Sequence, residues 1–118
     1  MKSFVETRVF TARLSDYLSD LAYRSLQNEL ALNPKKGAVI PGCGGLRKVR
    51  IEDRWRGKGK RGGARVIYLD IPEADLIEFI TIYGKDQQDD LTHGQKKLFA
   101  SLAKTARAEA RIAIGRIG

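Results

Sequence analysis

Two adjacent runs of strand-forming residues constrain the fold of this chain more than any other feature. The runs "ARVIYLDI" (Ala64–Ile71) and "DLIEFITIYGK" (Asp75–Lys85) are rich in β-branched and aromatic residues, as buried strands are. Only a short segment around Pro72–Ala74 separates them, and a proline in such a position indicates a turn. We therefore expect these runs to form an antiparallel pair within a sheet.

The residues before this pair predict two helices between further strands. "FVETRVF" (Phe4–Phe10) has the composition of a first strand. From Ala12 to Leu32 the leucines recur at helical spacing, and we expect Asp20 to separate two short helices as the N-cap of the second. Pro34 ends this helical section. A turn at Pro41–Gly45 and another strand follow.

The C-terminal quarter of the chain predicts a third helix. Thr92 and Gln95 have the spacing of a capping box, and apolar residues follow at helical intervals. A length of 118 residues is typical of one domain with its own core. We therefore predict a single α+β domain over residues 1–118, with two N-terminal helices packed on a small antiparallel sheet and a C-terminal helix.

The charge of the chain indicates an anionic partner. Lysine and arginine number 22 against 14 acidic residues, a formal net charge of +8, which suits nucleic acid, an acidic protein or a membrane surface. Cys43 is the sole cysteine, so no internal disulfide can form, as is usual in a reducing compartment. The N-terminus lacks the apolar core of a signal peptide, and no apolar run is long enough to span a membrane. We expect a cytoplasmic protein with no membrane partner.

Most of the excess charge lies in one stretch that leads into the predicted hairpin. The loop Asp53–Gly63 contains "RGKGKRGG", and only Glu52 and Asp53 oppose the cations around it. The nine cations of this basic cluster are Arg47, Lys48, Arg50, Arg54, Arg56, Lys58, Lys60, Arg61 and Arg65. A solvated loop tip would explain an isolated charge run, but this density beside a strand favours contact with a nucleic-acid backbone.

The loop itself matches none of the common phosphate-binding motifs. "GKGKRG" (Gly57–Gly62) fits G-x-G-x-x-G literally, but a loop precedes it and a strand follows, the reverse of the dinucleotide-binding arrangement. It also lacks the Gly-Lys-Ser/Thr of a P-loop. Its glycines permit unusual dihedrals and close approach of the backbone to a ligand. Trp55 either stacks on a base or fixes the loop to the core, and the sequence leaves both open.

The chain offers few residues for metal-dependent or cysteine-dependent chemistry. His93 is the single histidine, expected to be exposed in the first turn of the last helix, and Cys43 has no histidine base beside it in sequence. The acids of Asp86–Asp90 precede that helix, where its dipole favours negative charge. We expect neither a metal nor another cofactor.

RNA cleavage without a metal can proceed by attack of the ribose 2′-hydroxyl on the adjacent phosphate. A lysine whose pKa is lowered by neighbouring cations can act as acid or base, while an arginine remains charged and can bind the phosphate. Arg65 opens the strand behind the loop, so we expect it to be held in place there without filling the core. Tyr83 and Lys85 alternate onto one face of the last strand and could reach the same phosphate.

Several segments, taken in order, resemble a known family. "VIPGCGGLRKVR" (Val39–Arg50), "GKGKRGGARVIY" (Gly57–Tyr68), "ITIYGKDQQDDLTHGQKK" (Ile80–Lys97) and the N-terminal part from Phe4 to Gly42 are similar to RelE-family toxins, especially the HigB-like branch of bacterial toxin–antitoxin systems. The resemblance covers about residues 3–103, so the tail from about residue 104 extends beyond it.

The resemblance implies both an activity and partners. It implies a compact α+β fold and a metal-independent endoribonuclease that cuts mRNA during translation in the ribosomal A site. It also implies neutralisation by a cognate antitoxin, which we expect to be of the helix-turn-helix type. By position, the implied catalytic residues are Lys58, Lys60, Arg65, Tyr83 and Lys85; the implied RNA-binding residues are Arg47, Lys48 and Arg61. Trp55 and Arg56, within the same basic stretch, complete our set of RNA-binding candidates.

Two other functions remain open from the sequence. The same basic surface would serve a non-catalytic RNA- or DNA-binding module. A degenerate toxin that retains only antitoxin binding would also keep these motifs.

Overall fold

The computed structural model describes residues 2–52, 63–84, 88 and 90–117, and it has an α+β fold. The helices are α1 (Arg8–Tyr17), α2 (Asp20–Leu32) and α3 (His93–Ile117). The strands are β1 (Ser3–Glu6), β2 (Ala38–Val39), β3 (Arg47–Ile51), β4 (Ala64–Ile71) and β5 (Leu76–Gly84), with a 3₁₀ turn, η2 (Pro72–Ala74), between the last two. The hairpin predicted from the two apolar runs is confirmed.

The strands form one sheet in the order β1-β5-β4-β3-β2. β2 to β5 pair antiparallel, but β1 runs parallel to β5, with Ser3 opposite Leu76 and Glu6 opposite Phe79. The prediction of a wholly antiparallel sheet is therefore wrong at this edge. The antiparallel pairing of β2 to β5 leaves the outer edge of β5 without a partner strand. β1, from a distant part of the chain, pairs with that edge.

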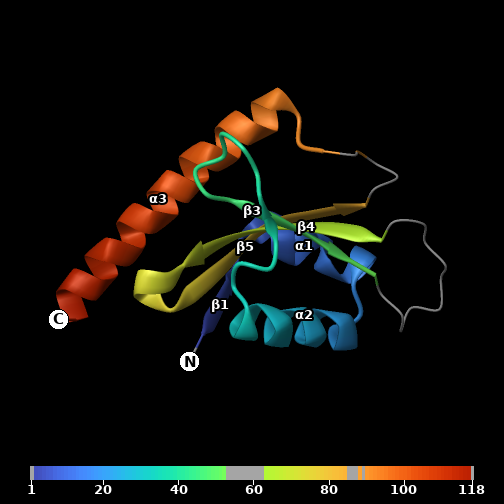
Figure 1. Ribbon diagram of the computed structural model, residues 1–118, viewed down its shortest axis with the longest axis horizontal. Coiled ribbons are helices and arrows are strands. Elements are labelled where there is room, and N and C mark those ends of the chain that lie inside the picture. The colour runs from blue at the N-terminus through green and yellow to red at the C-terminus, as the bar shows by residue number, and fades with distance from the viewer. Residues whose placement is uncertain (1, 53–62, 85–87, 89, 118) are drawn as a thin grey trace.

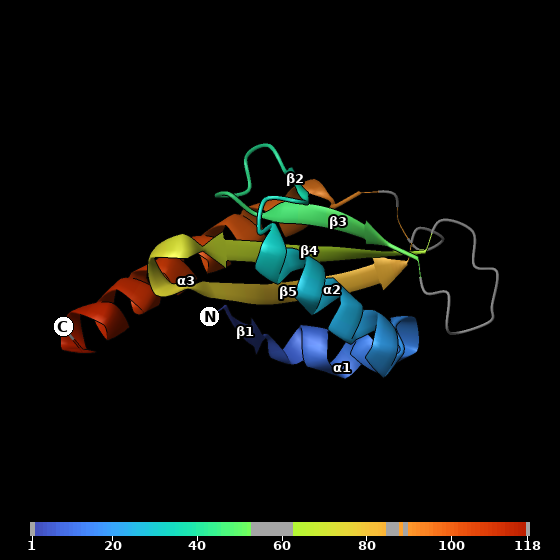
Figure 2. The ribbon, with the colours of Figure 1, turned by 60° about the horizontal axis from the view of Figure 1, so that its bottom comes forward.

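Helices cover both faces of this sheet (Figures 1 and 2). α1 and α2 lie on one face, where Phe10, Leu26 and Leu30 join a core with Val66 and Phe79 of the sheet. α3 crosses the opposite face, and Ala103 and Ala110 pack against a second core that contains Ile67, Leu69 and Ile80. The sequence predicted the three helices but not this division between the faces.

Side-chain caps fix where the first two helices begin. The Thr7 hydroxyl accepts the N–H of Phe10, so α1 begins at Arg8 and the strand ends at Glu6. The predicted strand Phe4–Phe10 is thus wrong in its second half. Ser19, not Asp20, caps α2 by accepting the N–H of Ala22; Asp20 is the first helical residue, where its charge suits the helix dipole.

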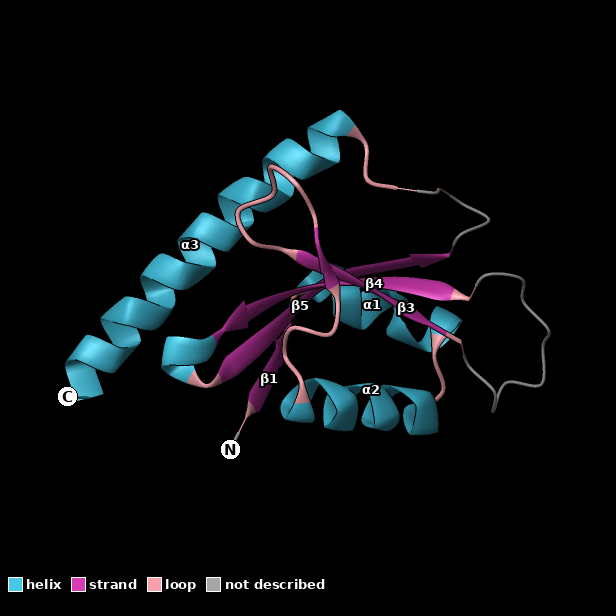
Figure 3. Cartoon of the chain, viewed as in Figure 1, coloured by secondary structure: helices cyan, strands magenta, loops and turns pink. Residues whose placement is uncertain are grey.

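The third helix begins as predicted. The Thr92 hydroxyl accepts the N–H of Gln95 at 3.1 Å, and the Gln95 side chain accepts the N–H of Thr92 at 2.9 Å, which is the expected capping box. The tail beyond residue 104 continues this helix to Ile117, as Figure 3 shows. No helix within the described ranges combines the length and apolar character that crossing a membrane requires.

A buried tyrosine connects α2 to the sheet. The Tyr68 hydroxyl donates to the carbonyl of Pro34 at 2.7 Å and accepts the N–H of Gly37 at 2.9 Å. Burial raises the pKa of this phenol, although the Gly37 N–H and the charge of Arg47 oppose the shift. These bonds fix the segment that joins α2 to β2.

Candidate functional site

Four of the predicted site residues lie in the described part of the chain: Arg47, Lys48, Arg65 and Tyr83. The other six, Trp55, Arg56, Lys58, Lys60, Arg61 and Lys85, lie outside the described residues. Ile51, Ala64 and Gly84 are opposite one another at one end of the sheet. The predicted loop therefore leaves and re-enters the sheet at the end where β5 also finishes.

Arg65 lies at this end of the sheet between two notable neighbours. In the sheet it is opposite Tyr83 of β5 on one side and Arg50 of β3 on the other. Alternation along β4 places it on the α3 face with Ile67. Arg65 and Tyr83 were expected to reach the same site, and the register brings them together as cross-strand neighbours.

Both side chains are more buried than the sequence suggested. Arg65 is 4% exposed and Tyr83 is 2% exposed. The expectation that Arg65 would not fill the core is therefore wrong. The strand position of each residue could be predicted, but the burial of Tyr83 depends on Leu91 and on α3 residues of the same core, which lie far from it in sequence or outside its strand.

The Tyr83 phenol has an unusual environment. Its oxygen is buried and forms no hydrogen bond with any described residue. Burial raises the pKa of Tyr83, the negative charge of Asp90 raises it further, and the positive charge of Arg65 opposes both. The phenol therefore remains protonated at neutral pH and has a proton available to donate.

Lys48 and Arg47 are neighbours in β3 but lie on opposite faces of the sheet. Lys48 is on the α3 face, where its ammonium group forms an ion pair with Asp90 at 3.5 Å. Arg47 donates to the carbonyls of Gly37 at 2.8 Å and Lys35 at 3.2 Å, on the α2 side. The structure groups Lys48 with Arg65 and Tyr83, and it gives Arg47 a role in holding the segment after α2.

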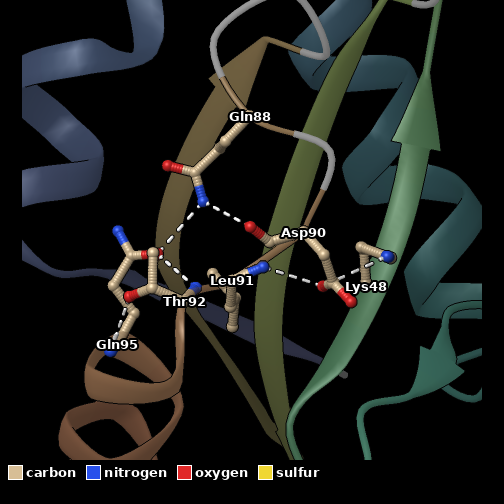
Figure 4. Close-up of polar contacts among 6 residues, drawn as sticks. All are labelled: Lys48, Gln88, Asp90, Leu91, Thr92 and Gln95. Atoms are coloured by element: carbon tan, nitrogen blue, oxygen red, sulfur yellow. Dashed lines mark hydrogen bonds and ion pairs between the residues drawn. The ribbon is translucent and has the colours of Figure 1, made fainter.

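Asp90 is a site residue that the sequence reasoning missed. Its acid cluster was attributed to the start of the helix, but its carboxylate accepts the N–H of Leu91 at 2.8 Å and pairs with Lys48 (Figure 4). Leu91 is buried in the same core as Tyr83. No sufficient signal for this contact was present in the sequence, because seven residues separate Asp90 from Tyr83 and an extended segment of that length can span about 24 Å.

Gly63, at the end of the predicted loop, requires glycine. It has a φ of +58°, and a Cβ there would collide with the carbonyl oxygen of Ile51. The expectation of unusual glycine dihedrals in this stretch is thus confirmed at Gly63, the one loop glycine that the structure describes. The expected close approach of the loop backbone to a ligand stays a prediction.

The remaining candidates considered from the sequence were a metal site, Cys43 and His93. In the ranges that the structure describes, no three His, Cys, Asp or Glu side chains gather in a way that could hold a metal ion. Cys43 is buried, burial raises the pKa of its thiol, and the Sγ faces the carbonyl of Lys96 at 3.8 Å. His93 is exposed at the first position of α3, as expected.

No family model matches the chain. The site is therefore described by its own residues: a buried arginine and a buried phenol beside Lys48 and Asp90, at the sheet end that carries the basic stretch. This arrangement can bind an anion electrostatically and can supply a proton.

Proposed function

We propose that this chain is a toxin of the RelE family, in its HigB-like branch, that cleaves mRNA on the ribosome in the cytoplasm. Its fold would then be the RelE-like α+β fold, and its partners would be mRNA, the ribosome and a cognate antitoxin. The proposal rests on the resemblance of the sequence motifs and on the chemistry of the residues at the end of the sheet where β4 begins and β5 finishes.

The observation that supports cleavage best is the pairing of Arg65 with Tyr83. A guanidinium held by β4 in a largely water-excluded position stabilises added negative charge on a phosphate more strongly than a solvated one does. The Tyr83 phenol is protonated at neutral pH and so has a proton to deliver to the leaving oxygen. Its raised pKa makes it a weaker acid than an exposed tyrosine, so its position rather than its acidity would carry the catalysis. In this proposal Arg65 stabilises the transition state and Tyr83 is the general acid.

The basic cluster contributes affinity and the remaining chemistry. We propose that three lysines take part in the acid–base step: Lys58, Lys60 and Lys85. The residues proposed to bind RNA are Lys48, Trp55, Arg56 and Arg61. Arg47, on the opposite face, contributes indirectly because it holds the segment after α2. The high density of cations in the sequence before Arg65 would favour the attack of the 2′-hydroxyl, because cations offset the negative charge that develops on the phosphoryl oxygens.

The test is cleavage of mRNA on programmed ribosomes by purified protein, with reaction products mapped to the nucleotide. Cleavage of the mRNA within the segment that the ribosome protects supports the proposal. Tyr83→Phe, which retains the ring, should slow single-turnover cleavage by about 10²-fold, as loss of a general acid does. Intact mRNA at saturating wild-type protein would overturn the proposal.

A non-catalytic nucleic-acid-binding module is the second candidate, and the burial of Arg65 and Tyr83 favours it. A substrate reaches side chains that are 4% and 2% exposed only if the cover over them moves. Binding of RNA by the wild-type protein without any cleavage on ribosomes would support this function. Absence of both activities, with retained binding to an adjacent-gene antitoxin, would support a degenerate toxin.

A further inference from the structure

The Asp90 carboxylate lies in surroundings that suit a bound anion. One of its oxygens, Oδ1, accepts the N–H of Leu91 at 2.8 Å and lies 3.5 Å from the Lys48 ammonium nitrogen (Figure 4). The Leu91 N–H and the charges of Lys48 and Lys96 together hold the pKa of Asp90 below its ordinary value. The Leu91 N–H and the Lys48 ammonium group therefore contact one carboxylate oxygen, and the charge of Lys96 adds to their effect on its pKa.

The backbone around this carboxylate is held by its own hydrogen bonds. The Gln88 side-chain amide donates to the Asp90 carbonyl at 2.8 Å and to the Gln95 side chain at 3.0 Å. Gln95 is in turn part of the capping box with Thr92. The Leu91 N–H is thus held in place by hydrogen bonds that do not involve the Asp90 side chain, and Lys48 is anchored separately through its backbone in β3.

The Asp90 carboxylate is more exposed to solvent than its ammonium partner. The Asp90 side chain is 54% exposed, whereas that of Lys48 is 21% exposed. Exposed ion pairs of this length are weak, so an incoming anion would have only a weakly held carboxylate to displace. The buried phenol oxygen of Tyr83 has no hydrogen-bond partner among the described residues. The negative charge of Asp90 raises the pKa of this phenol, so the two groups interact electrostatically.

We propose that Lys48 and the Leu91 N–H form a phosphate subsite that the chain's own Asp90 carboxylate occupies until an RNA phosphate displaces it. A phosphodiester offers the same charge and acceptor oxygens as a carboxylate, so it can replace Asp90 on these donors. The inference rests on the proposed function, since it takes RNA as the ligand. Asp90 is in this view an internal competitor that weakens RNA binding beside Tyr83.

The test is RNA binding by Asp90→Asn, which keeps an oxygen for the Leu91 N–H but removes the competing charge. The matched control is Asp16→Asn, the same charge change at an exposed position on α1, on the other face of the sheet. The probe is a short 2′-O-methyl oligoribonucleotide, which cannot be cleaved by its 2′-oxygen. Asp90→Asn should bind it about fivefold more tightly than Asp16→Asn, as expected for release of an exposed ion pair.

The salt dependence of binding separates a new phosphate contact from a general change of charge. One added single-strand phosphate contact makes the slope of log K against log salt steeper by about 0.7. The gain should disappear when Lys48→Ala is combined with Asp90→Asn. Equal affinity and slope for Asp90→Asn and Asp16→Asn, or a gain that persists without Lys48, would overturn the subsite.

The two proposals fail in different ways. Ribosome-dependent cleavage by the wild-type protein, with no binding gain in Asp90→Asn, removes the subsite and leaves the toxin function. A Lys48-dependent gain in a protein that cleaves no mRNA supports the subsite and removes the nuclease.

Discussion

Replacement of Arg65 tests the proposed chemistry most directly. Its side chain is 4% exposed, so truncation affects both stability and charge. Arg65→Ala removes two buried methylene groups, worth about 0.8 kcal/mol each, together with the guanidinium and its polar interactions. We expect a loss of about 2–4 kcal/mol in the free energy of unfolding. That is a large share of the stability of a domain of this size.

Arg65→Met separates the two effects. Methionine retains an unbranched side chain and fills most of the space, so the loss of stability should be only about 1–2 kcal/mol, from the polar interactions of the guanidinium. The charge is removed in both variants. We therefore expect both to lower the single-turnover cleavage rate by about 10²-fold or more, as loss of one preorganised donor does.

Arg50→Ala is the matched control. Arg50 is directly opposite Arg65 in the sheet, but it is exposed, so its removal should cost less than about 0.5 kcal/mol of stability. Its charge is screened by water, and binding should weaken by at most about 1 kcal/mol while the rate at saturation stays near that of the wild type.

The assay combines urea unfolding of each variant with single-turnover cleavage on programmed ribosomes, at a temperature where every variant is folded. If folded Arg65→Met cleaves at the wild-type rate, then the buried guanidinium has no part in the reaction. If Arg50→Ala instead lowers the rate at saturation, the reacting phosphate lies at β3 rather than between β4 and β5.

Four further outcomes can be measured. Tyr68→Phe leaves the Pro34 carbonyl and the Gly37 N–H without their partner. It should lower the free energy of unfolding, measured in urea, by about 2–3 kcal/mol. Gly63→Ala should cost about 2 kcal/mol or more, because of its positive φ and the collision at β3; an unchanged urea midpoint would contradict this. Burial, then repulsion from Glu109, raises the pKa of Glu78. The stability that protonated Glu78 contributes is present below the ordinary glutamate pKa of about 4.3 and is lost as pH rises through the raised value. Glu78→Gln should therefore raise the melting temperature at pH ~7 but not at pH ~3.5. Elemental analysis of the purified protein should find no stoichiometric zinc or manganese.

The sequence predicted best those elements whose signals are local. β4 and β5 follow from continuous β-branched and aromatic runs, and the start of α3 follows from the spacing of Thr92 and Gln95. The start of α1 was missed because "TRVF" has strand composition, and only the Thr7 cap shows that the helix has begun. The direction of β1 depends on a partner that is distant in sequence, so no local pattern encodes it.

The candidate site shows the same division. The place of Arg65 and Tyr83 at one end of the sheet follows from alternation along two well-predicted strands. Their burial could not be predicted, because it depends on how α3 and Leu91 cover the sheet. Asp90 was missed because an acid before a helix already has a sufficient local reason to be there, and its contact with Lys48 joins two distant segments.

The pairing of β1 with β5 has a consequence for the order in which the chain can fold. Thr7 donates its hydroxyl to the carbonyl of Ile80, a partner 73 residues later, and its N–H to that of Phe79. During synthesis the first strand and α1 therefore leave the ribosome long before the strand that they cover exists. Contacts of such long range form slowly, since the loop between them must close first. A nascent chain that ends before Leu76 has no docking place for its own N-terminus, so the α1 face of the sheet can be completed only after β5 has emerged.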